Sequence, residues 1–132
     1  MVGSSGQRPT GRGGGRRRLS RSADFDRVFR EGRSYASRHV VLHAFPRAGA
    51  DADASTPRLG ISVGRRVGGA VERNRVKRLL RGAFWAVAPD LPASYDFVLV
   101  ARPDAGELAR RQGEPAFEAA LRELAARGGL TG

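Results

Sequence analysis

The sequence predicts an α/β fold in which a single mixed sheet packs against helices as a sandwich. Apolar residues alternate along 40–45 and 59–63, which is typical of strands with one buried face. A nearly continuous apolar run at 95–101 indicates a strand buried on both faces. Between these strands, residues 70–88 repeat apolar side chains with the period of an α-helix. Strands and helices therefore alternate along one chain, as they do in sandwiches of a sheet and helices.

The first residues differ in composition from the rest of the chain. The 132 residues carry a formal net charge of +11, and residues 1–22 hold six Arg and no acid. Residues 1–17 are mostly Gly, Ser and Arg, with too few apolar groups to fold. We therefore expect a disordered basic tail over 1–17 and one folded domain over 18–132.

A short helix is expected directly after the tail. Ser22 can act as its N-cap, and Gly32 ends it. Phe25, Val28 and Phe29 are spaced i, i+3, i+4, so they share one face of this helix. That face is expected to pack on the sheet.

The remaining elements follow from the same patterns. In chain order they are a short strand at 34–36, a strand over 40–45, a loop at 47–57 expected to be a hairpin connection, a strand at 59–63, a helix over 70–88, a strand at 95–101 and a helix over 115–127. Pro89 and Pro92 stop the longer helix, and Gly128 with Gly129 closes the last one. The expected sheet has about four strands and is packed by three helices.

Composition excludes several kinds of site. The chain has no cysteine, so disulfides, thiolate metal sites and Cys nucleophiles are excluded. No apolar run approaches the roughly 20 residues of a membrane span. No apolar stretch follows the basic N-terminus, as it would in a secretory signal. We expect a cytoplasmic protein with no membrane partner, whose positive charge is directed at a polyanion.

The helix over 70–88 has a core face and a face of one charge sign. The apolar residues on one arc are Val76, Leu79, Leu80, Ala83, Phe84 and Val87. The residues on the opposite arc are Arg73, Asn74, Lys77, Arg78 and Arg81, with Arg75 to one side. Over 58–81, eight basic residues stand against the single acid Glu72, so the acids that ordinarily neutralise a solvated helix face are missing. This pattern favours polyanion binding over a solvated surface helix or a helix lying on a membrane.

The residues before this helix extend the cationic surface. Arg65 and Arg66 follow the strand at 59–63, and Gly64, Gly68 and Gly69 keep the backbone open to close approach. Backbone N–H groups at the start of the helix also favour phosphate. The glycine spacing matches neither the dinucleotide nor the P-loop pattern, so a mononucleotide site is rejected.

The run LGISVGRRVGGAVERNRVKRLLRGAF resembles the signature of the bacterial ribonuclease P protein subunit. That signature is a strand, a basic pair, a Gly-containing turn and then Ala-Val-x-Arg-Asn-Arg-x-Lys-Arg-x-x-Arg. The order of elements matches over about residues 18–127. The resemblance implies an α/β sandwich with a left-handed βαβ crossover, against the usual handedness.

The resemblance also implies a function shared between protein and RNA. A catalytic RNA that holds most of the Mg²⁺ would cut the 5′ leader from precursor tRNA, and this chain would be its non-catalytic protein subunit, inactive alone. No catalytic residue, no metal held by the protein and no obligate protein partner are expected. The expected contacts to the catalytic RNA are Arg65, Arg66, Arg73, Asn74, Arg75, Lys77, Arg78 and Arg81. The expected leader cleft consists of Arg18, Phe25, Phe29, Val41, His43, Ser62 and Arg66. His43 stands where the family often has Tyr, and Arg65–Arg66 stands where Lys is common.

Three other functions compete with this hypothesis. A small ribosomal or RNA-chaperone protein would share the charge pattern but would not support processing of precursor tRNA. A DNA-binding protein would need a helix-turn-helix pattern or a dimerisation element, and the sequence shows neither. A protein-only nuclease would need paired carboxylates or a His acid–base pair. His39 and His43 would lie about 13 Å apart on a strand, too far for one metal ion.

Overall fold

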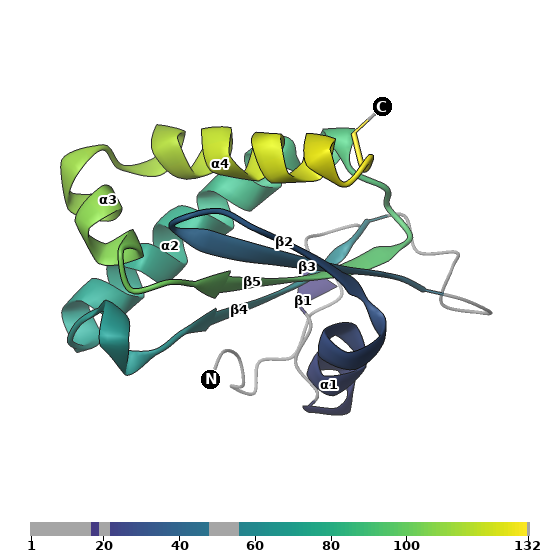
Figure 1. Ribbon diagram of the computed structural model, residues 1–132, viewed down its shortest axis with the longest axis horizontal. Coiled ribbons are helices and arrows are strands. Elements are labelled where there is room, and N and C mark those ends of the chain that lie inside the picture. Colours follow the sequence, from purple (N-terminus) through teal and green to yellow (C-terminus); the bar gives the residue numbers. More distant parts are fainter. Residues whose placement is uncertain (1–16, 19–21, 48–55, 132) are drawn as a thin grey trace.

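The computed structural model describes residues 17–18, 22–47 and 56–131, which form one mixed sheet with helices on both faces (Figure 1). The strands are β1 (Arg17–Arg18), β2 (Arg33–Ala36), β3 (Val40–Pro46), β4 (Arg58–Val63) and β5 (Tyr95–Ala101). The α-helices are α1 (Ser22–Glu31), α2 (Ala70–Val87), α3 (Ala105–Arg111) and α4 (Glu114–Arg127). Two 3-10 helices, η2 (Arg65–Val67) and η3 (Ala88–Asp90), flank α2. The predicted sandwich of one mixed sheet and helices is confirmed.

The sheet has the strand order β1-β4-β5-β3-β2. Its central strand, β5, is parallel to β4 and antiparallel to β3. This position explains the continuous apolar run of β5, because helices cover the sheet on both sides of it. The parallel pair β4 and β5, joined through α2, forms the expected βαβ unit, and its left-handed sense stays a prediction.

Three features differ from the sequence prediction. The loop at 47–57 is not a hairpin connection, because β5 lies between β3 and β4. Arg17, assigned to the tail, pairs with Arg58 in the two-residue strand β1, whereas residues 1–16 lie outside the described part of the chain. A further helix, α3, follows β5, and its buried Ala105 and Leu108 join the main core.

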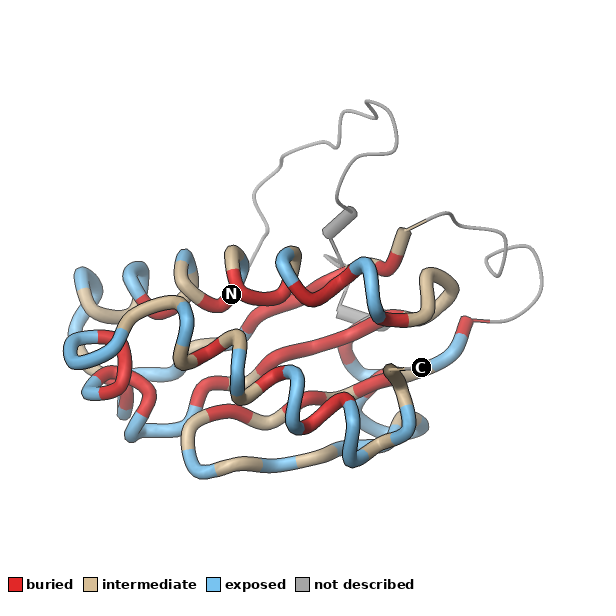
Figure 2. Tube along the Cα trace, turned by 90° about the horizontal axis from the view of Figure 1, so that it is seen from above, coloured by how far each residue is buried: buried red, intermediate tan, exposed pale blue. Residues whose placement is uncertain are grey.

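The two faces of the sheet are covered unequally. Helices α2, α3 and α4 pack on one face, and α1 packs on part of the other (Figure 1). The larger core cluster, which includes Phe84, Phe97 and Phe117, lies under the first three helices. Figure 2, where buried residues are red, shows burial concentrated on the strands and on the inner side of the helices. The smaller core cluster consists of Phe25, Val28 and Val98 and packs α1 against the sheet. On this face, burial of the sheet therefore depends largely on one short helix.

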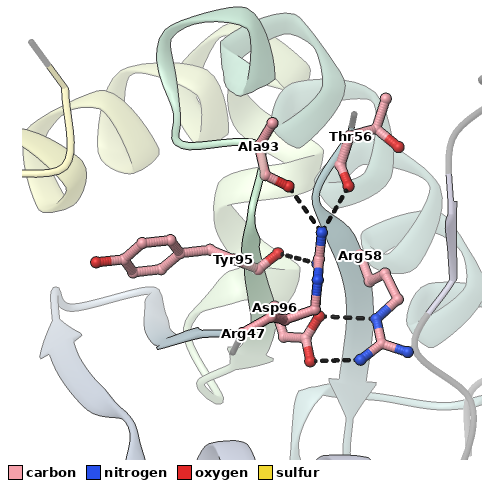
Figure 3. A network of polar contacts seen from close by, with 6 residues as sticks. All are labelled: Arg47, Thr56, Arg58, Ala93, Tyr95 and Asp96. Atoms are coloured by element: carbon pink, nitrogen blue, oxygen red, sulfur yellow. Dashed lines mark hydrogen bonds and ion pairs between the residues drawn. The ribbon is translucent and has the colours of Figure 1, made fainter. Parts of the chain in front are cut away.

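A buried ion network fixes the start of β5 on the α1 side of the sheet (Figure 3). The Asp96 carboxylate accepts hydrogen bonds from Arg47 at 2.8 Å and from both Nε and Nη2 of Arg58 at 2.8 Å. Arg47 also donates to the backbone carbonyls of Tyr95, Thr56 and Ala93. The network therefore joins the end of β3, the approach to β4 and the start of β5.

Candidate nucleic-acid interface

Helix α2 separates its apolar and cationic residues as the sequence predicts. Val76, Leu80 and Val87 are fully buried against the sheet and the neighbouring helices. The exposed polar residues of the cationic stretch of this helix are Asn74, Arg75, Arg78 and Arg81. Arg73 and Lys77 are half-buried on the flank between the two faces. The outer face of α2 is therefore cationic over residues 73–81.

The only acid of α2 is turned away from this face. The carboxylate of Glu72 accepts a hydrogen bond from Arg110 of α3 at 3.0 Å. Gly68, with φ of 154°, lies directly against the Glu72 side chain, and a Cβ there would collide with it. The Glu72 carboxylate is thus held toward α3, where it neutralises the charge of Arg110 rather than the charge of a cation on α2.

The cations of α2 and η2 differ from the ion-paired arginines elsewhere. Arg38, Arg47, Arg58, Arg110, Arg111, Arg122 and Arg127 each have a carboxylate partner. Within residues 17–18, 22–47 and 56–131, no carboxylate lies within ion-pair distance of Arg65, Arg66, Arg73, Arg75, Lys77, Arg78 or Arg81. We define these seven residues together with Asn74 as the cationic surface. Its charge is uncompensated, which is the electrostatic requirement of a phosphate-binding surface.

The Nε of Arg73 is buried and has no hydrogen-bond partner among the described residues.

η2 connects the sheet to α2 and presents the basic pair. Val67 is buried and anchors this short helix, while Arg65 and Arg66 are exposed. Gly69 caps α2 with backbone only, so no side chain occupies the N–H groups of the first turn. The sequence prediction that the basic pair continues the surface of α2 agrees with this placement.

The opposite face of the sheet carries the residues expected to form the leader cleft. Register places His43, Val98 and Gly60 side by side in one row across β3, β5 and β4. Phe25 and Val28 of α1 pack on Val98, so this row is covered. The neighbouring row consists of Val41, Val100 and Ser62. Ser62 is exposed and the two valines are half-buried, so this row is not fully covered.

The two aromatic residues of α1 have different environments. Phe25 is only 9% exposed, whereas Phe29 is 44% exposed. The ring of Phe29 meets His43 edge-on, with ring centroids 4.7 Å apart. We call the surface formed by Phe29, His43, Val41, Val100 and Ser62 the open strip. Burial lowers the pKa of His43 from its ordinary value, so its ring is neutral at pH 7.

The two other residues predicted for the leader cleft are Arg18 and Arg66. The backbone of Arg18 pairs with Leu59 at the β4 edge, and its side chain lies outside the described atoms. Arg66 lies beyond the end of β4, at the same end of the sheet as Ser62. Arg102, which was not singled out from the sequence, directly follows the buried run of β5. It is exposed, its backbone N–H donates to His39, and strand alternation puts it on the face of Val100.

The described residues contain no group of three His, Cys, Asp or Glu that could hold a metal ion. Asp26 is exposed on α1, and Asp51 and Asp53 lie outside the described residues. No helix in the described part of the chain is both long and apolar enough to cross a membrane.

The assignment of the two α2 faces can be tested on stability. Leu80→Ala is expected to lower the free energy of unfolding by about 2–5 kcal/mol, because Leu80 is fully buried. Arg78→Ala should stay within about 0.5 kcal/mol, since Arg78 is exposed. Urea unfolding of both variants measures the difference. A large loss of stability in Arg78→Ala would mean that the faces are assigned wrongly.

Comparison with known proteins gives a consistent result. The sequence model of the Ribonuclease P family matches residues 15–125. The chain is 38% identical over 106 residues to the ribonuclease P protein component of Shouchella clausii, covering 80% of this chain and 84% of the relative. It is 42% identical over 90 residues to that of Natranaerobius thermophilus, covering 68% and 74%.

Solved structures agree with the sequence comparison. The RNase P protein of Staphylococcus aureus superposes with a TM-score of 0.72 at 27% identity, covering 87% of this chain and 97% of that one. The RNase P protein of Thermotoga maritima gives a TM-score of 0.68 at 30% identity, covering 83% and 96%. Similarity therefore extends over nearly the whole described domain.

Proposed function

The chain belongs to the bacterial ribonuclease P protein family, and from this we propose that its cationic surface binds the catalytic RNA while its open strip binds the 5′ leader of precursor tRNA. The protein is thus a subunit of ribonuclease P, an endoribonuclease of tRNA processing. This membership replaces the alternative of a ribosomal or RNA-chaperone protein.

The observation that carries the first assignment is the uncompensated charge of α2 and η2. Seven cations lie along the two elements without a carboxylate partner in the described chain, while Glu72 is withdrawn by Arg110. Each phosphate contact releases counterions, so such a surface binds a folded RNA with strong salt dependence. Arginine also suits this role because its planar guanidinium can donate two parallel hydrogen bonds to phosphate.

The open strip suits a single strand rather than a duplex. Phe29 offers a partly exposed ring, and the neutral His43 supports it edge-on. Aromatic side chains bind unpaired bases by stacking, with little dependence on base identity. Val41 and Ser62 lie in the neighbouring row of the sheet, where Ser62 is exposed and Val41 is half-buried. We therefore assign the leader to this surface and expect only modest sequence preference there.

α2 and α1, which carry residues of the two surfaces, lie on opposite faces of the sheet (Figure 1), and Arg65 and Arg66 follow the end of β4. A protein placed between two RNAs in this way screens their mutual repulsion, because its positive charge lies between two sets of phosphates. We propose that the catalytic RNA holds the Mg²⁺ ions that drive hydrolysis, since Mg²⁺ is commonly bound by phosphate oxygens and water. We expect this work to take place in the cytoplasm.

Reconstitution tests the proposed function. The purified protein alone should not cleave precursor tRNA, and addition of a bacterial ribonuclease P RNA with Mg²⁺ should give accurate 5′ cleavage. The gain due to the protein should be largest at low Mg²⁺, because there its charge replaces missing counterions. It should also be larger for substrates with a leader of several nucleotides than for those with one nucleotide.

Two results would contradict this proposal. Chelator-sensitive cleavage by RNA-free protein, lost on Asp26→Asn, would place the catalyst on the protein. If the protein improved cleavage equally for long and short leaders, the assignment of the leader to the open strip would be wrong. The assignment of the catalytic RNA to the cationic surface would then be judged by RNA binding alone.

A further inference from the structure

We propose that Gly60 of β4 is a positioning residue for leader binding. By lacking a Cβ it lets Phe25 seat α1 close against the sheet, and this seating holds the ring of Phe29 over the open strip. The inference rests on the proposed function, since it assumes that the leader binds there. It concerns which residue controls that surface, not which residues touch RNA.

The contact between Gly60 and Phe25 leaves no room for a side chain. A Cβ at Gly60 would lie 2.5 Å from Cζ and 2.6 Å from Cε1 of Phe25. Ordinary contacts between carbon atoms are about 3.5–4.0 Å, so the ring would have to move by about 1 Å. Phe25 is 9% exposed and Gly60 is buried, so both are enclosed on the α1 side of the sheet.

Backbone conformation does not explain the glycine. The described glycines with positive φ are Gly68, Gly113 and Gly129, and Gly60 is not among them. Gly60 lies within β4 and pairs with Val98 in regular register. An L-residue could therefore adopt its backbone conformation, and what the position requires is space for the Phe25 ring.

The other end of α1 is fixed separately. A Cβ at Gly32 would lie 2.5 Å from the Ala44 carbonyl oxygen, so the chain just beyond α1 approaches the backbone of β3 closely. Val28, between the two glycine contacts, is fully buried. A Cβ at Gly60 would therefore displace the Phe25 ring, while the C-terminal end of α1 stays in place.

The displaced Phe25 ring would act on the open strip through Phe29. This residue is one helical turn after Phe25, and their ring centroids are 6.4 Å apart. A Phe25 ring pushed off Gly60 would therefore crowd the Phe29 ring and disturb its edge-on contact with His43. Because stacking and edge contacts fall off steeply with distance, a movement of about 1 Å is enough to weaken the aromatic platform.

The test uses Gly60→Ala in the holoenzyme reconstituted with a bacterial ribonuclease P RNA. Kd is measured for precursor tRNA with a leader of several nucleotides and for the same tRNA with a one-nucleotide leader. We expect Gly60→Ala to raise Kd for the long leader by about fivefold or more, which corresponds to losing one stacked base. Kd for the short leader, assembly with the RNA and the single-turnover cleavage rate at saturation should keep their wild-type values.

Two further variants separate positioning from a loss of stability. Ile61→Val alters the adjacent residue, whose side chain enters the opposite core cluster, and should leave the ratio of the two Kd values unchanged. Gly60→Ala combined with Phe25→Leu removes the ring atoms that meet the new Cβ. The double variant should bind the long leader more tightly than Gly60→Ala alone.

Each outcome decides a separate question. If the wild-type holoenzyme binds long and short leaders equally, the proposed leader function fails. If the wild type discriminates and Gly60→Ala keeps the same ratio, only the role of Gly60 is overturned. If Ile61→Val lowers the ratio as much as Gly60→Ala does, or if Phe25→Leu gives no recovery, the effect is general instability and positioning is overturned.

Discussion

Replacing Asp96 with alanine is expected to lower the free energy of unfolding by about 3–5 kcal/mol, the range found when one partner of a buried ion pair is removed. The side chains of Asp96 and Arg47 are 1% and 2% exposed, and that of Arg58 is 17% exposed. All three charged hydrogen bonds to Asp96 are 2.8 Å long (Figure 3). Without the carboxylate, the guanidinium groups of Arg47 and Arg58 would lose these three charged hydrogen bonds, and this is the source of the loss.

Urea unfolding followed by circular dichroism measures this effect. Asp104→Ala is the matched control, because Asp104 also pairs with an arginine, at side-chain exposures of 78% for Arg38 and 50% for Asp104. An exposed pair of this kind contributes about 0–1 kcal/mol. Asp96→Asn should fall between the two variants, since an amide oxygen still accepts a hydrogen bond. Equal losses for Asp96→Ala and Asp104→Ala would show that the buried network does not stabilise the domain.

Helix α2 was predictable from sequence because its two signals coincide. The period of its apolar residues fixes which side is buried, and the absence of acids marks the other side. The structure agrees on both, with Val76 and Leu80 fully buried and Arg78 and Arg81 exposed. Both signals come from residues close together in the sequence, so they can be recognised without knowledge of the tertiary structure.

Strand order was not predictable in the same way. A loop of small and acidic residues between two amphipathic strands suggests a hairpin, yet β5 inserts between β3 and β4. The insertion is a long-range pairing that no local pattern encodes. α3 was missed for a related reason: it has seven residues and is stabilised by packing of Ala105 and Leu108 on the core rather than by its own propensity.

The candidate site was predictable in outline but not in its detail. Phe25 and Phe29 occupy equivalent positions on one helix face, and only the structure shows that Gly60 accommodates the first while the second remains partly exposed. The orientation of Glu72 likewise depends on Arg110, which is 38 residues away in sequence. Arg102 was not singled out because a single cation after a strand carries no pattern.

The largest functional effect is expected from removing three cations of α2 together. In the triple variant Arg75→Ala, Arg78→Ala and Arg81→Ala, three exposed guanidinium groups on the outer face are lost. Each phosphate contact contributes about 0.7–0.9 to the slope of log K against log salt. Loss of three contacts should therefore reduce this slope by roughly 2–3. Near 0.1 M salt, it should weaken the affinity for the catalytic RNA by about 10²–10³-fold.

Filter binding or fluorescence titration with the catalytic RNA at several salt concentrations measures both quantities. The control is the triple variant Arg111→Ala, Arg122→Ala and Arg127→Ala, which removes the same charge from α3 and α4. Each of these arginines is exposed and paired with a carboxylate, so its charge is already compensated. If total charge alone governs binding, the two triple variants will lose affinity equally and the RNA interface is not on α2. If the outer face of α2 contacts the RNA, only the first variant will lose both affinity and salt slope, and its stability will stay close to that of the wild type.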